Sequence, residues 1–405
     1  MTTAIGESPK VEVKSPPVAR AGGPCEPMVL HVRVVTGHGG GPEKTILNSP
    51  RFLREMGFRS KLAYLHPPGD PGFAKLQARG RALDAEVLSV PDRGPFDLSV
   101  IGRLAAICRE NNVAIWHGHD YKSNLLGLLV GWYWPCKLVT TVHGWGVLSG
   151  RMPLYNWFDR LGLRFYRATI CVSDDLRETC LRAGVPPERC RVVYNAIDTQ
   201  EFHRTCCPAE AKQRLGAPSE GLLIGAVGRL SREKRFDLLI DAMCRLRQNG
   251  HAVSLWIAGD GNERQALETQ IAELDCQAFV RLLGHVTDPR EFYEALDLYV
   301  LSSDREGLPN VVLEAMAMGV PVVATRVAGV PMLLEDGACG MIVEPSNVEA
   351  MVNAIQQLAV DPQRRLDLVR GAYERVASQF LFSQRMLKVA AIYKEVLKRG
   401  EQTVG

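Results

Sequence analysis

Short apolar runs alternate with longer segments of helical period along most of the chain. In the first half, runs rich in valine, isoleucine and leucine lie at residues 29–35, 61–65, 86–90, 113–117, 138–142, 169–172 and 191–194. In the second half they lie at 222–227, 254–258, 280–283, 298–301, 322–324 and 340–343. The runs are continuous, as is typical of strands covered by helices on both faces. The pattern predicts an α/β fold with parallel sheets built from βα units.

A polar, helix-poor stretch separates the two sets of strands. It runs from His203 to Gly221 and contains Pro208 and Pro218. The segment before the first strand holds five prolines and lacks the apolar core of a signal peptide. We therefore expect a disordered tail over 1–27, an N-terminal Rossmann-like domain over 28–203, a linker over 204–220, a C-terminal Rossmann-like domain over 221–380 and a final helix over 381–405.

The composition fits a globular protein of two domains and argues against one class of binding partner. Of the 405 residues, 46% are hydrophobic and 23% are charged. The 48 basic and 45 acidic side chains give a net charge of +3, so the excess of basic residues that nucleic-acid binding usually requires is absent. We therefore expect no nucleic-acid partner.

Cysteine usage and hydropathy favour a cytoplasmic location. The eleven cysteines form no C-x-x-C pair, which fits reduced thiols better than a disulfide framework. The longest apolar run, Leu125 to Cys136, has about a dozen residues, whereas spanning a bilayer takes roughly 20. We therefore expect no transmembrane helix.

The segment from Ser302 to Pro321 predicts a phosphate site at the start of a helix. Pro309 fits the first helical position, and Gly319 followed by Pro321 ends the helix about ten residues later. The free N–H groups of residues 308–311 and the positive end of the helix dipole favour an anion.

Two glutamates flank the start of this helix. Glu306 stands on the loop before it, and Glu314 lies roughly 7 to 8 Å further along the axis at 1.5 Å per residue. A carboxylate at that distance from a bound phosphate can accept hydrogen bonds from both hydroxyls of a ribose. The arrangement suits a nucleoside diphosphate joined to another group.

Glu306 and Glu314 resemble the E-x7-E signature of retaining nucleotide-sugar glycosyltransferases of family 4, the glycosyl transferases group 1. Other segments resemble motifs of that family in the same order: Gly39-Gly40-Gly41, Val142-His143-Gly144, the segments 193–198, 225–234 and 256–261, and Gly284-His285-Val286. In the P-N-G-V-D motif, Tyr194 replaces proline and Ala196 replaces glycine. The resemblance spans roughly Met28 to Arg399. It implies a GT-B fold, in which two doubly wound domains face each other across a cleft, with the acceptor bound by the domain over 28–203 and the nucleotide-sugar donor by the domain over 221–380. It also implies that the last helix, from Ser383, crosses back onto the first domain.

The resemblance also implies roles for charged residues. Arg229 and Lys234 would hold the leaving diphosphate, as a fork and as a point charge; the alternative is a solvated basic loop. Glu314 would bind the ribose and Glu306 would lie near the donor sugar, whereas helix capping would explain only one of them. No opposite-face nucleophile for a double displacement is evident. The family instead implies front-face transfer, in which the departing phosphate helps to deprotonate the acceptor.

His143 follows a strand and matches the family's H-G pair, so we expect it to contact the donor sugar. His117 and His119 point the same way on another strand, and with Asp120 they suggest a metal site as an alternative. Because the family needs no metal, we expect neither a bound cation nor a cofactor.

The expected site therefore combines two sets of residues. The catalytic set is His143, Arg229, Lys234 and Glu306. The donor-binding set is Gly40, Gly41, Arg229, Lys234, Val286, Gly307, Leu308, Pro309 and Glu314.

The segment from Arg151 to Arg167 mixes aromatic and basic residues. It interleaves Tyr155, Trp157, Phe158, Phe165 and Tyr166 with Arg160, Arg164 and Arg167. A basic aromatic helix can rest on an anionic membrane surface, which would suit a lipid-linked acceptor. The ordinary alternative is a helix whose aromatic residues pack against the sheet.

These observations favour a cytoplasmic, metal-independent, retaining glycosyltransferase. It would move a hexose-type sugar from a nucleoside-diphosphate sugar to a glycan, lipid-linked or small-molecule acceptor, in cell-envelope polysaccharide or glycolipid biosynthesis. The alternatives are a nucleotide-sugar epimerase, which would need no acceptor, and a nucleotide-sugar-binding protein without turnover.

Overall fold

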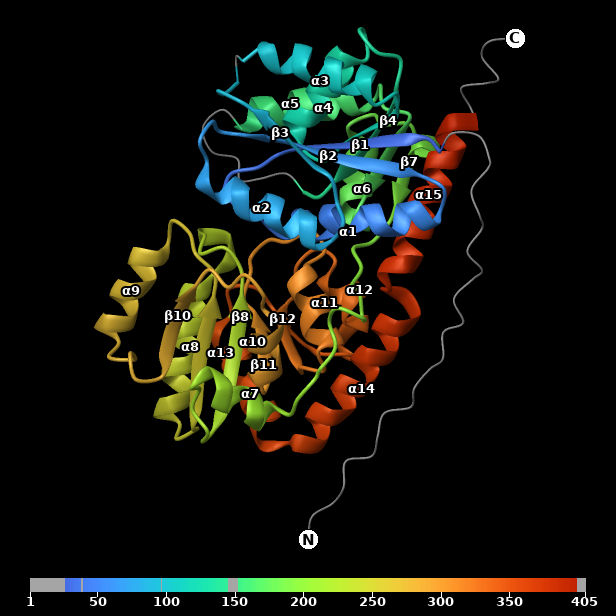
Figure 1. Cartoon of the computed structure of the whole chain (residues 1–405). Coiled ribbons are helices and arrows are strands. Elements are labelled where there is room, and N and C mark those ends of the chain that lie inside the picture. Colours follow the sequence, from blue (N-terminus) through green and yellow to red (C-terminus); the bar gives the residue numbers. More distant parts are fainter. Residues whose placement is uncertain (1–25, 38, 96, 145–151, 399–405) are drawn as a thin grey trace.

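The computed structural model of the protein describes residues 26–37, 39–95, 97–144 and 152–398, without the side chains of 152–156 and 158. The predicted tail lies outside these residues except at Glu26 and Pro27, and residues 399–405 of the predicted final helix lie outside them as well. Figure 1 shows two α/β domains stacked one above the other.

The N-terminal domain surrounds a seven-stranded parallel sheet in the order β3-β2-β1-β4-β5-β6-β7. The strands are β1 (Met28–Val34), β2 (Arg59–His66), β3 (Val87–Pro91), β4 (Val113–Gly118), β5 (Lys137–Val142), β6 (Ala168–Cys171) and β7 (Cys190–Val192). The helices are α1 (Gly41–Glu55), α2 (Pro71–Ala82), α3 (Ser99–Glu110), α4 (Tyr121–Val130), α5 (Met152–Leu163) and α6 (Asp174–Arg182). Helices α3 and α4 pack on one face of the sheet, and α1 and α2 pack on the other.

The C-terminal domain surrounds a six-stranded parallel sheet in the order β10-β9-β8-β11-β12-β13. The strands are β8 (Leu222–Val227), β9 (Val253–Ala258), β10 (Val280–Gly284), β11 (Leu298–Leu301), β12 (Val322–Thr325) and β13 (Met341–Val343). The helices are α8 (Phe236–Gln248), α9 (Arg264–Glu273), α10 (Arg290–Ala295), α11 (Asn310–Ala317), α12 (Val330–Leu333), α13 (Val348–Val360) and α14 (Pro362–Gln379). One face is covered by α8, α9 and α13, and the other by α10, α11, α12 and α14.

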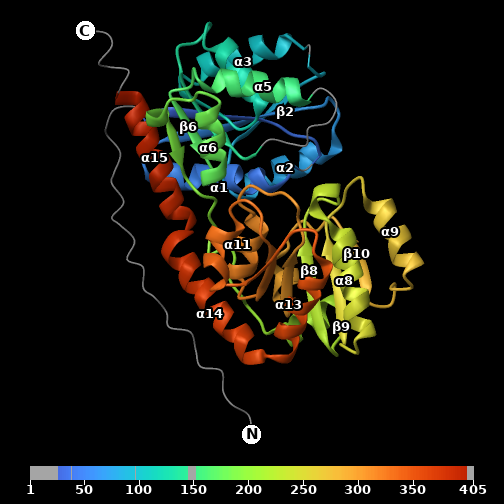
Figure 2. The same ribbon diagram turned by 180° about the vertical axis from the view of Figure 1, so that it is seen from behind.

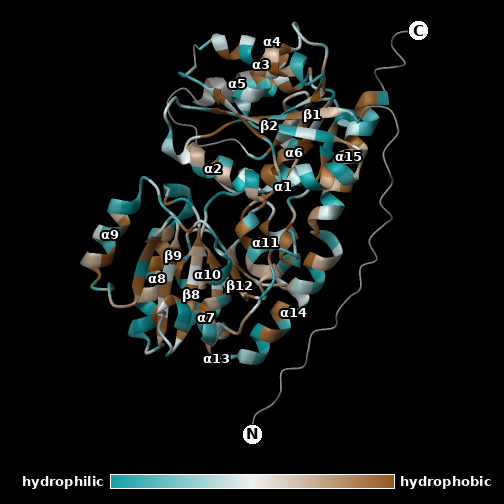
Figure 3. Cartoon of the chain, viewed as in Figure 1, coloured by the Kyte–Doolittle hydropathy of each residue, from teal (hydrophilic) through white to brown (hydrophobic). Residues whose placement is uncertain are grey.

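Burial explains why the strands appear as continuous apolar runs. Every residue of β6, β9, β11 and β12 is buried, because helices cover both faces of each sheet. Figure 3 shows the hydrophobic residues concentrated in strands such as β9 and β12. Each predicted run corresponds to a strand, so the prediction of two doubly wound parallel sheets is confirmed.

The predicted linker is not helix-poor, so that expectation was wrong. Helix α7 (Pro208–Leu215) lies in its middle and ends at Gly216, whose φ is 61°. Pro208 stands in the first turn, where a missing N–H breaks no helical bond. Ala211 is fully buried against the second domain, and Lys212 Nζ lies 2.5 Å from Asp297 Oδ2. This short helix has a polar average composition because only one side of it is buried.

The last two helices join the domains. Figure 2 shows α14 and α15 (Phe382–Lys398) running along one side of the molecule, from the C-terminal domain to the N-terminal domain. Where they meet, the Ile197 N–H donates to Phe380 O at 2.8 Å and the Phe382 N–H donates to Ile197 O at 2.9 Å. Helix α15 then buries Val389 and Tyr393 in the N-terminal core. The predicted return of the final helix is confirmed, one residue earlier than expected.

Tyr393 should stabilise this crossing strongly. Its ring is fully buried, and its hydroxyl lies 2.5 Å from Nδ1 of His117. Replacing a buried aromatic residue with alanine typically costs about 3 to 5 kcal/mol. We expect Tyr393→Ala to lower the urea midpoint of unfolding, measured by circular dichroism.

Leu387 provides the control because it lies on the same helix and is 58% exposed. Leu387→Ala should change the free energy of unfolding by no more than about 0.5 kcal/mol. Equal losses in the two variants would contradict this account of α15.

Candidate active site

The strand order of each sheet reverses at one point. The reversal lies between β1 and β4 in the first domain and between β8 and β11 in the second. Ligands of open α/β sheets bind outside the carboxyl ends of the strands at such points. Here both points border one cleft of about 620 Å³, whose lining includes Arg33, His119, His143, Lys234, Glu306 and Gly307.

Two loops of the second domain bring an ion pair into the cleft. Lys234, after β8, has its Nζ 2.6 Å from Oε1 of Glu306, after β11. The Ser303 hydroxyl donates to the same oxygen at 2.7 Å. The Ser302 hydroxyl donates to Lys234 O at 2.7 Å and thereby holds the two loops together. Two predicted catalytic residues, Lys234 and Glu306, therefore lie in direct contact.

A glycine turn behind these loops explains the two glycines of the family motif at 256–261. A Cβ atom on Gly259 would lie 1.7 Å from Gly228 O, and one on Gly261 would lie 2.4 Å from Leu230 O. Only glycine allows the turn after β9 to pack so closely against the loop after β8. The motif therefore positions the loop that carries Lys234.

The start of α11 leaves backbone donors available. Pro309 is the N-cap of this helix and not its first helical residue, because α11 begins at Asn310. Within the described part of the chain, the amide groups of Leu308, Asn310 and Val311 donate to no other residue. The carbonyl of Leu308 accepts from Asn195 Nδ2 at 2.8 Å. These amides and the helix dipole suit an anion.

Glu314 is fully buried and has partners from both domains. The Tyr293 hydroxyl donates to Oε2 at 2.9 Å, and Lys44 on α1 forms an ion pair with Oε1. Sequence reasoning missed Lys44 because no motif links positions so far apart in the chain. The only feature of the sequence that could have indicated Lys44 is its position just after the family's glycine loop, Gly39-Gly40-Gly41.

The two domains also approach each other through backbone. A Cβ atom on Gly307 would lie 2.8 Å from His143 O. At the glycine loop, Asn310 Nδ2 donates to Gly41 O at 3.1 Å. The adjacent Gly40 N–H donates to Oε2 of Glu43 at 2.5 Å. His143 and Gly307 therefore line the cleft, as does Pro42, which directly follows Gly40 and Gly41.

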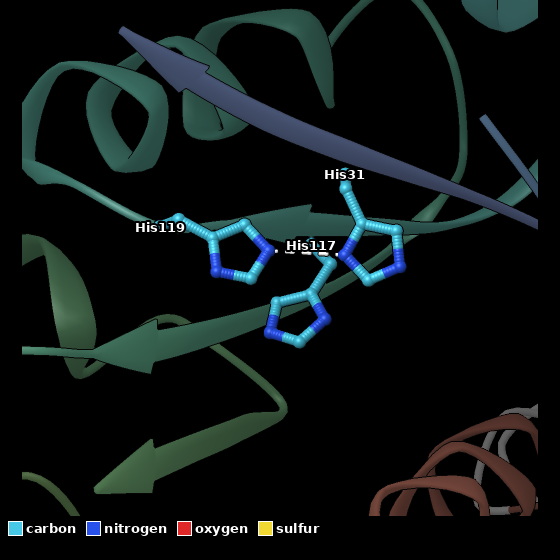
Figure 4. Close-up of side chains that lie close together, drawn as sticks. All are labelled: His31, His117 and His119. Atoms are coloured by element: carbon cyan, nitrogen blue, oxygen red, sulfur yellow. Dashed lines mark hydrogen bonds between the residues drawn. The ribbon is translucent and has the colours of Figure 1, made fainter. Parts of the chain in front are cut away.

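Three histidines of the first domain, His31, His117 and His119, lie close together (Figure 4), and His119 and His143 line the cleft. His31 on β1 has its Nδ1 3.0 Å from Nε2 of His119, and His119 Nδ1 lies 3.3 Å from Nε2 of His143. His117 on β4 contacts Tyr393 and the hydroxyl of Thr141, the latter at 2.8 Å. Burial lowers the pKa of His31 to about 3 and holds the pKa values of His117 and His119 well below their usual range. These rings are therefore neutral at pH 7.

Comparison with known proteins identifies the family. Residues 39–201 match Glycosyltransferase Family 4, and residues 209–375 match Glycosyl transferases group 1. The lipopolysaccharide core biosynthesis glycosyltransferase LpsE of Rhizobium meliloti is 36% identical over 243 residues, which are 57% of this chain and 68% of LpsE. The chain belongs to glycosyltransferase family 4.

Other relatives extend the similarity over the whole fold. The D-inositol 3-phosphate glycosyltransferase of Thermobispora bispora is 27% identical over 91% of this chain and 93% of its own. The structure of Anabaena HepE in complex with UDP and glucose superposes with a TM-score of 0.79 and 21% identity, over 91% of this chain and 99% of HepE. Sucrose-phosphate synthase from Thermosynechococcus elongatus superposes with a TM-score of 0.77 and 20% identity, over 92% and 100% of the two chains. The two superpositions show that the chain has the GT-B fold.

Of the predicted site residues, His143, Lys234, Glu306 and Gly307 line the cleft, whereas seven others are not part of its lining: Gly40, Gly41, Arg229, Val286, Leu308, Pro309 and Glu314. Arg229 is exposed, and its charge acts on Glu233. Val286 is half-buried and packs against the core of the second domain. Leu308 is buried as well, so only its backbone can meet a ligand. The roles of all the predicted site residues in donor binding and catalysis remain predictions.

The metal alternative involves different residues from those suggested by the sequence. Asp120 caps α4, accepting from the Ser123 N–H at 2.9 Å, and it also accepts from the Val34 N–H at 2.7 Å. The third histidine, His31, instead joins His117 and His119 in a group whose ring nitrogens lie within 4.8 Å of one another. Arg385 and Arg33 add positive charge, which lowers the pKa values of these rings further. That charge disfavours a cation at this glycosyltransferase site.

The predicted membrane segment is only partly described. Arg151 and the side chains of Tyr155 and Phe158 lie outside the described residues. Tyr166 is buried and donates to Asn124 O at 2.7 Å, which contradicts a role for it at a membrane surface. Among the described helices, none has the length and apolarity needed to cross a bilayer.

The buried histidines predict how stability depends on pH. Below pH about 6.5 the unfolded chain binds protons at His31, His117 and His119, whereas the folded protein does not. The free energy of unfolding should therefore fall as the pH is lowered from about 6.5 toward 5, by about 1.4 kcal/mol per histidine per pH unit. Urea unfolding at several pH values measures this slope. His31→Leu should make the slope shallower, and an unchanged slope would count against neutral histidines.

Proposed function

We propose that this family-4 enzyme transfers a hexose-type sugar from a nucleoside-diphosphate sugar to a glycan, lipid-linked or small-molecule acceptor, with retention of configuration and without a metal ion. The observation that carries the proposal is the Lys234–Glu306 ion pair at the start of α11, with Glu314 one turn further along that helix. LpsE, which acts in lipopolysaccharide core biosynthesis, supports a role in making cell-envelope glycans. The UDP and glucose in HepE support the class of donor.

Lys234 and α11 provide the positive charge that the leaving diphosphate needs. Charge builds on that group as the bond to the sugar breaks, and fixed donors stabilise it without reorganising. The ammonium group and the free amides of α11 are such donors. Removing one donor from a preorganised site typically costs about 3 to 4 kcal/mol.

Glu314 provides acceptors for a ribose. Both of its oxygens already have partners, and the pair with Lys44 must open if the ribose is to use Oε1. Lys44 therefore competes with the nucleotide, whereas Lys234 assists it.

The surroundings of Glu306 favour front-face transfer. Lys234 and Ser303 both donate to Oε1, so this oxygen is occupied by hydrogen bonds and made less nucleophilic. In front-face transfer the acceptor oxygen bonds to the sugar carbon on the face that the phosphate leaves, and a phosphate oxygen takes the acceptor proton. His143 lines the opposite wall of the cleft, where it would contact the donor sugar.

Nucleotide binding should separate the roles of the two lysines. We expect Lys234→Met to weaken binding of the matching nucleoside diphosphate by tenfold or more, because a charge-assisted contact is lost. Glu314→Ala should weaken it as well, whereas Lys44→Met should not. Calorimetric titration with UDP, GDP and ADP measures these affinities. If Lys234→Met and Glu314→Ala both bound as tightly as the wild type, the donor site would be misplaced.

Turnover should be independent of metal and should require an acceptor. Because Lys234 and α11 supply the charge, we expect excess EDTA to leave the rate unchanged. NMR of the product should show the same anomeric configuration as the donor. A rate restored only by a divalent cation, or an inverted product, would refute this mechanism. Interconversion of the donor without an acceptor would instead indicate an epimerase.

A further inference from the structure

Helix α4 exposes an apolar stripe on the outer side of the N-terminal domain. Tyr121, Leu125, Leu128 and Trp132 recur at helical spacing, so they share one side of α4 and its extension. The opposite side faces the core. Leu125 is 53% exposed and Trp132 is 86% exposed, and Tyr133 beside it is exposed as well. A soluble surface helix normally places charged or polar residues at such positions.

Helix α5 continues the same surface. Trp157 and Leu161 on α5 and Phe165 in the turn after it recur every four residues, and all three are exposed. A Cβ atom on Gly162 would lie 3.2 Å from Leu128 Cδ1, so α4 and α5 are in contact. Figure 1 shows both helices at the end of the first domain away from the C-terminal domain. The aromatic face is defined here as Leu125, Trp132, Tyr133, Trp157, Leu161 and Phe165.

The charge of this region differs from that of the remaining chain. Residues 121–167 contain six basic and one acidic side chains, a net charge of +5, whereas the other 42 basic and 44 acidic side chains give −2. The single acid, Asp159, is buried. The same segment holds four of the six tryptophans. Arg164 and Arg167 are exposed beside Phe165.

We propose that the aromatic face is a docking surface for an anionic lipid bilayer. Tryptophan and tyrosine favour the headgroup region, and neighbouring basic residues are attracted to anionic lipids. A second copy of the chain fits less well, because a two-fold interface would place two segments of net charge +5 against each other.

The aromatic face begins at the rim of the cleft, so a bilayer bound to it would lie next to the candidate active site. The first residue of α4, Tyr121, lines the cleft, as do Asp159 and Arg160 of α5. The exposed residues of both helices extend from that rim along the outer surface. A bilayer on the aromatic face would therefore lie beside the acceptor side of the cleft, within reach of a membrane-anchored acceptor. This last step rests on the proposed function, whereas the docking does not.

Vesicle co-sedimentation of the full chain tests the proposal. The probes are phosphatidylcholine vesicles with and without a large fraction of phosphatidylglycerol, at low and high salt. We expect binding to the anionic vesicles at low salt, with at least a tenfold loss at high salt. Trp132→Glu and Leu125→Glu should each weaken binding at least tenfold, because a carboxylate replaces an inserted apolar group. Leu366→Glu is the matched control, since Leu366 on α14 is 63% exposed in the other domain; it should bind like the wild type.

Parallel measurements make each outcome decisive. Urea unfolding and nucleotide titration of the three variants should match the wild type, so a folding defect or a failure of the donor site would be recognised separately. Wild-type protein that stays in the supernatant at low salt overturns the proposal. So does a Trp132→Glu variant that binds as well as the wild type. A dimer seen by light scattering and dispersed by Trp132→Glu would assign the face to a second copy instead.

Discussion

The buried carboxylates around the cleft are paired with cations, and this constraint determines what the cleft can accept. Three carboxylates with little exposure are each opposed by one cation: Glu43 by Arg33, Glu306 by Lys234 and Glu314 by Lys44. Leaving one such charge unpaired typically costs about 3 to 5 kcal/mol. A ligand that separates a pair must therefore replace the lost partner. Hydroxyl groups can replace a cation and phosphate oxygens can replace a carboxylate, so a sugar nucleotide meets the requirement and an apolar ligand does not.

The strands follow from local sequence, which is why they could be predicted. A strand between two helical layers must be apolar throughout, and a parallel sheet places its motif loops at one edge. The pairing of Lys44 with Glu314 could not be predicted, because it depends on how two separately folded domains meet. The prediction that Pro309 is the first helical residue was wrong by one position. A proline at the start of a helix suits the N-cap nearly as well as the first turn.

Amphipathic pattern alone did not separate core from surface in the first domain. Tyr166 and Phe165 are adjacent aromatic residues, yet the first is buried and the second is exposed. Their environments differ because α5 packs on α4, which no local signal reveals. Trp132 lies outside the basic aromatic segment that the sequence emphasised, and the structure brings it to the same surface. Likewise α7 lies in a polar stretch because only one of its sides is buried.

The chain crosses between the domains twice, once near Ile197 and once near Phe380, and the two crossings lie side by side. This has a mechanical consequence. The backbone of Ile197 is hydrogen-bonded to both Phe380 and Phe382, so the outgoing and returning segments are joined side by side. Two parallel connections fixed to each other resist twisting and sliding but permit bending about their shared line. The two domains should therefore open and close by rotation about one hinge axis. A ligand bound to one domain then also determines the angle of the other domain.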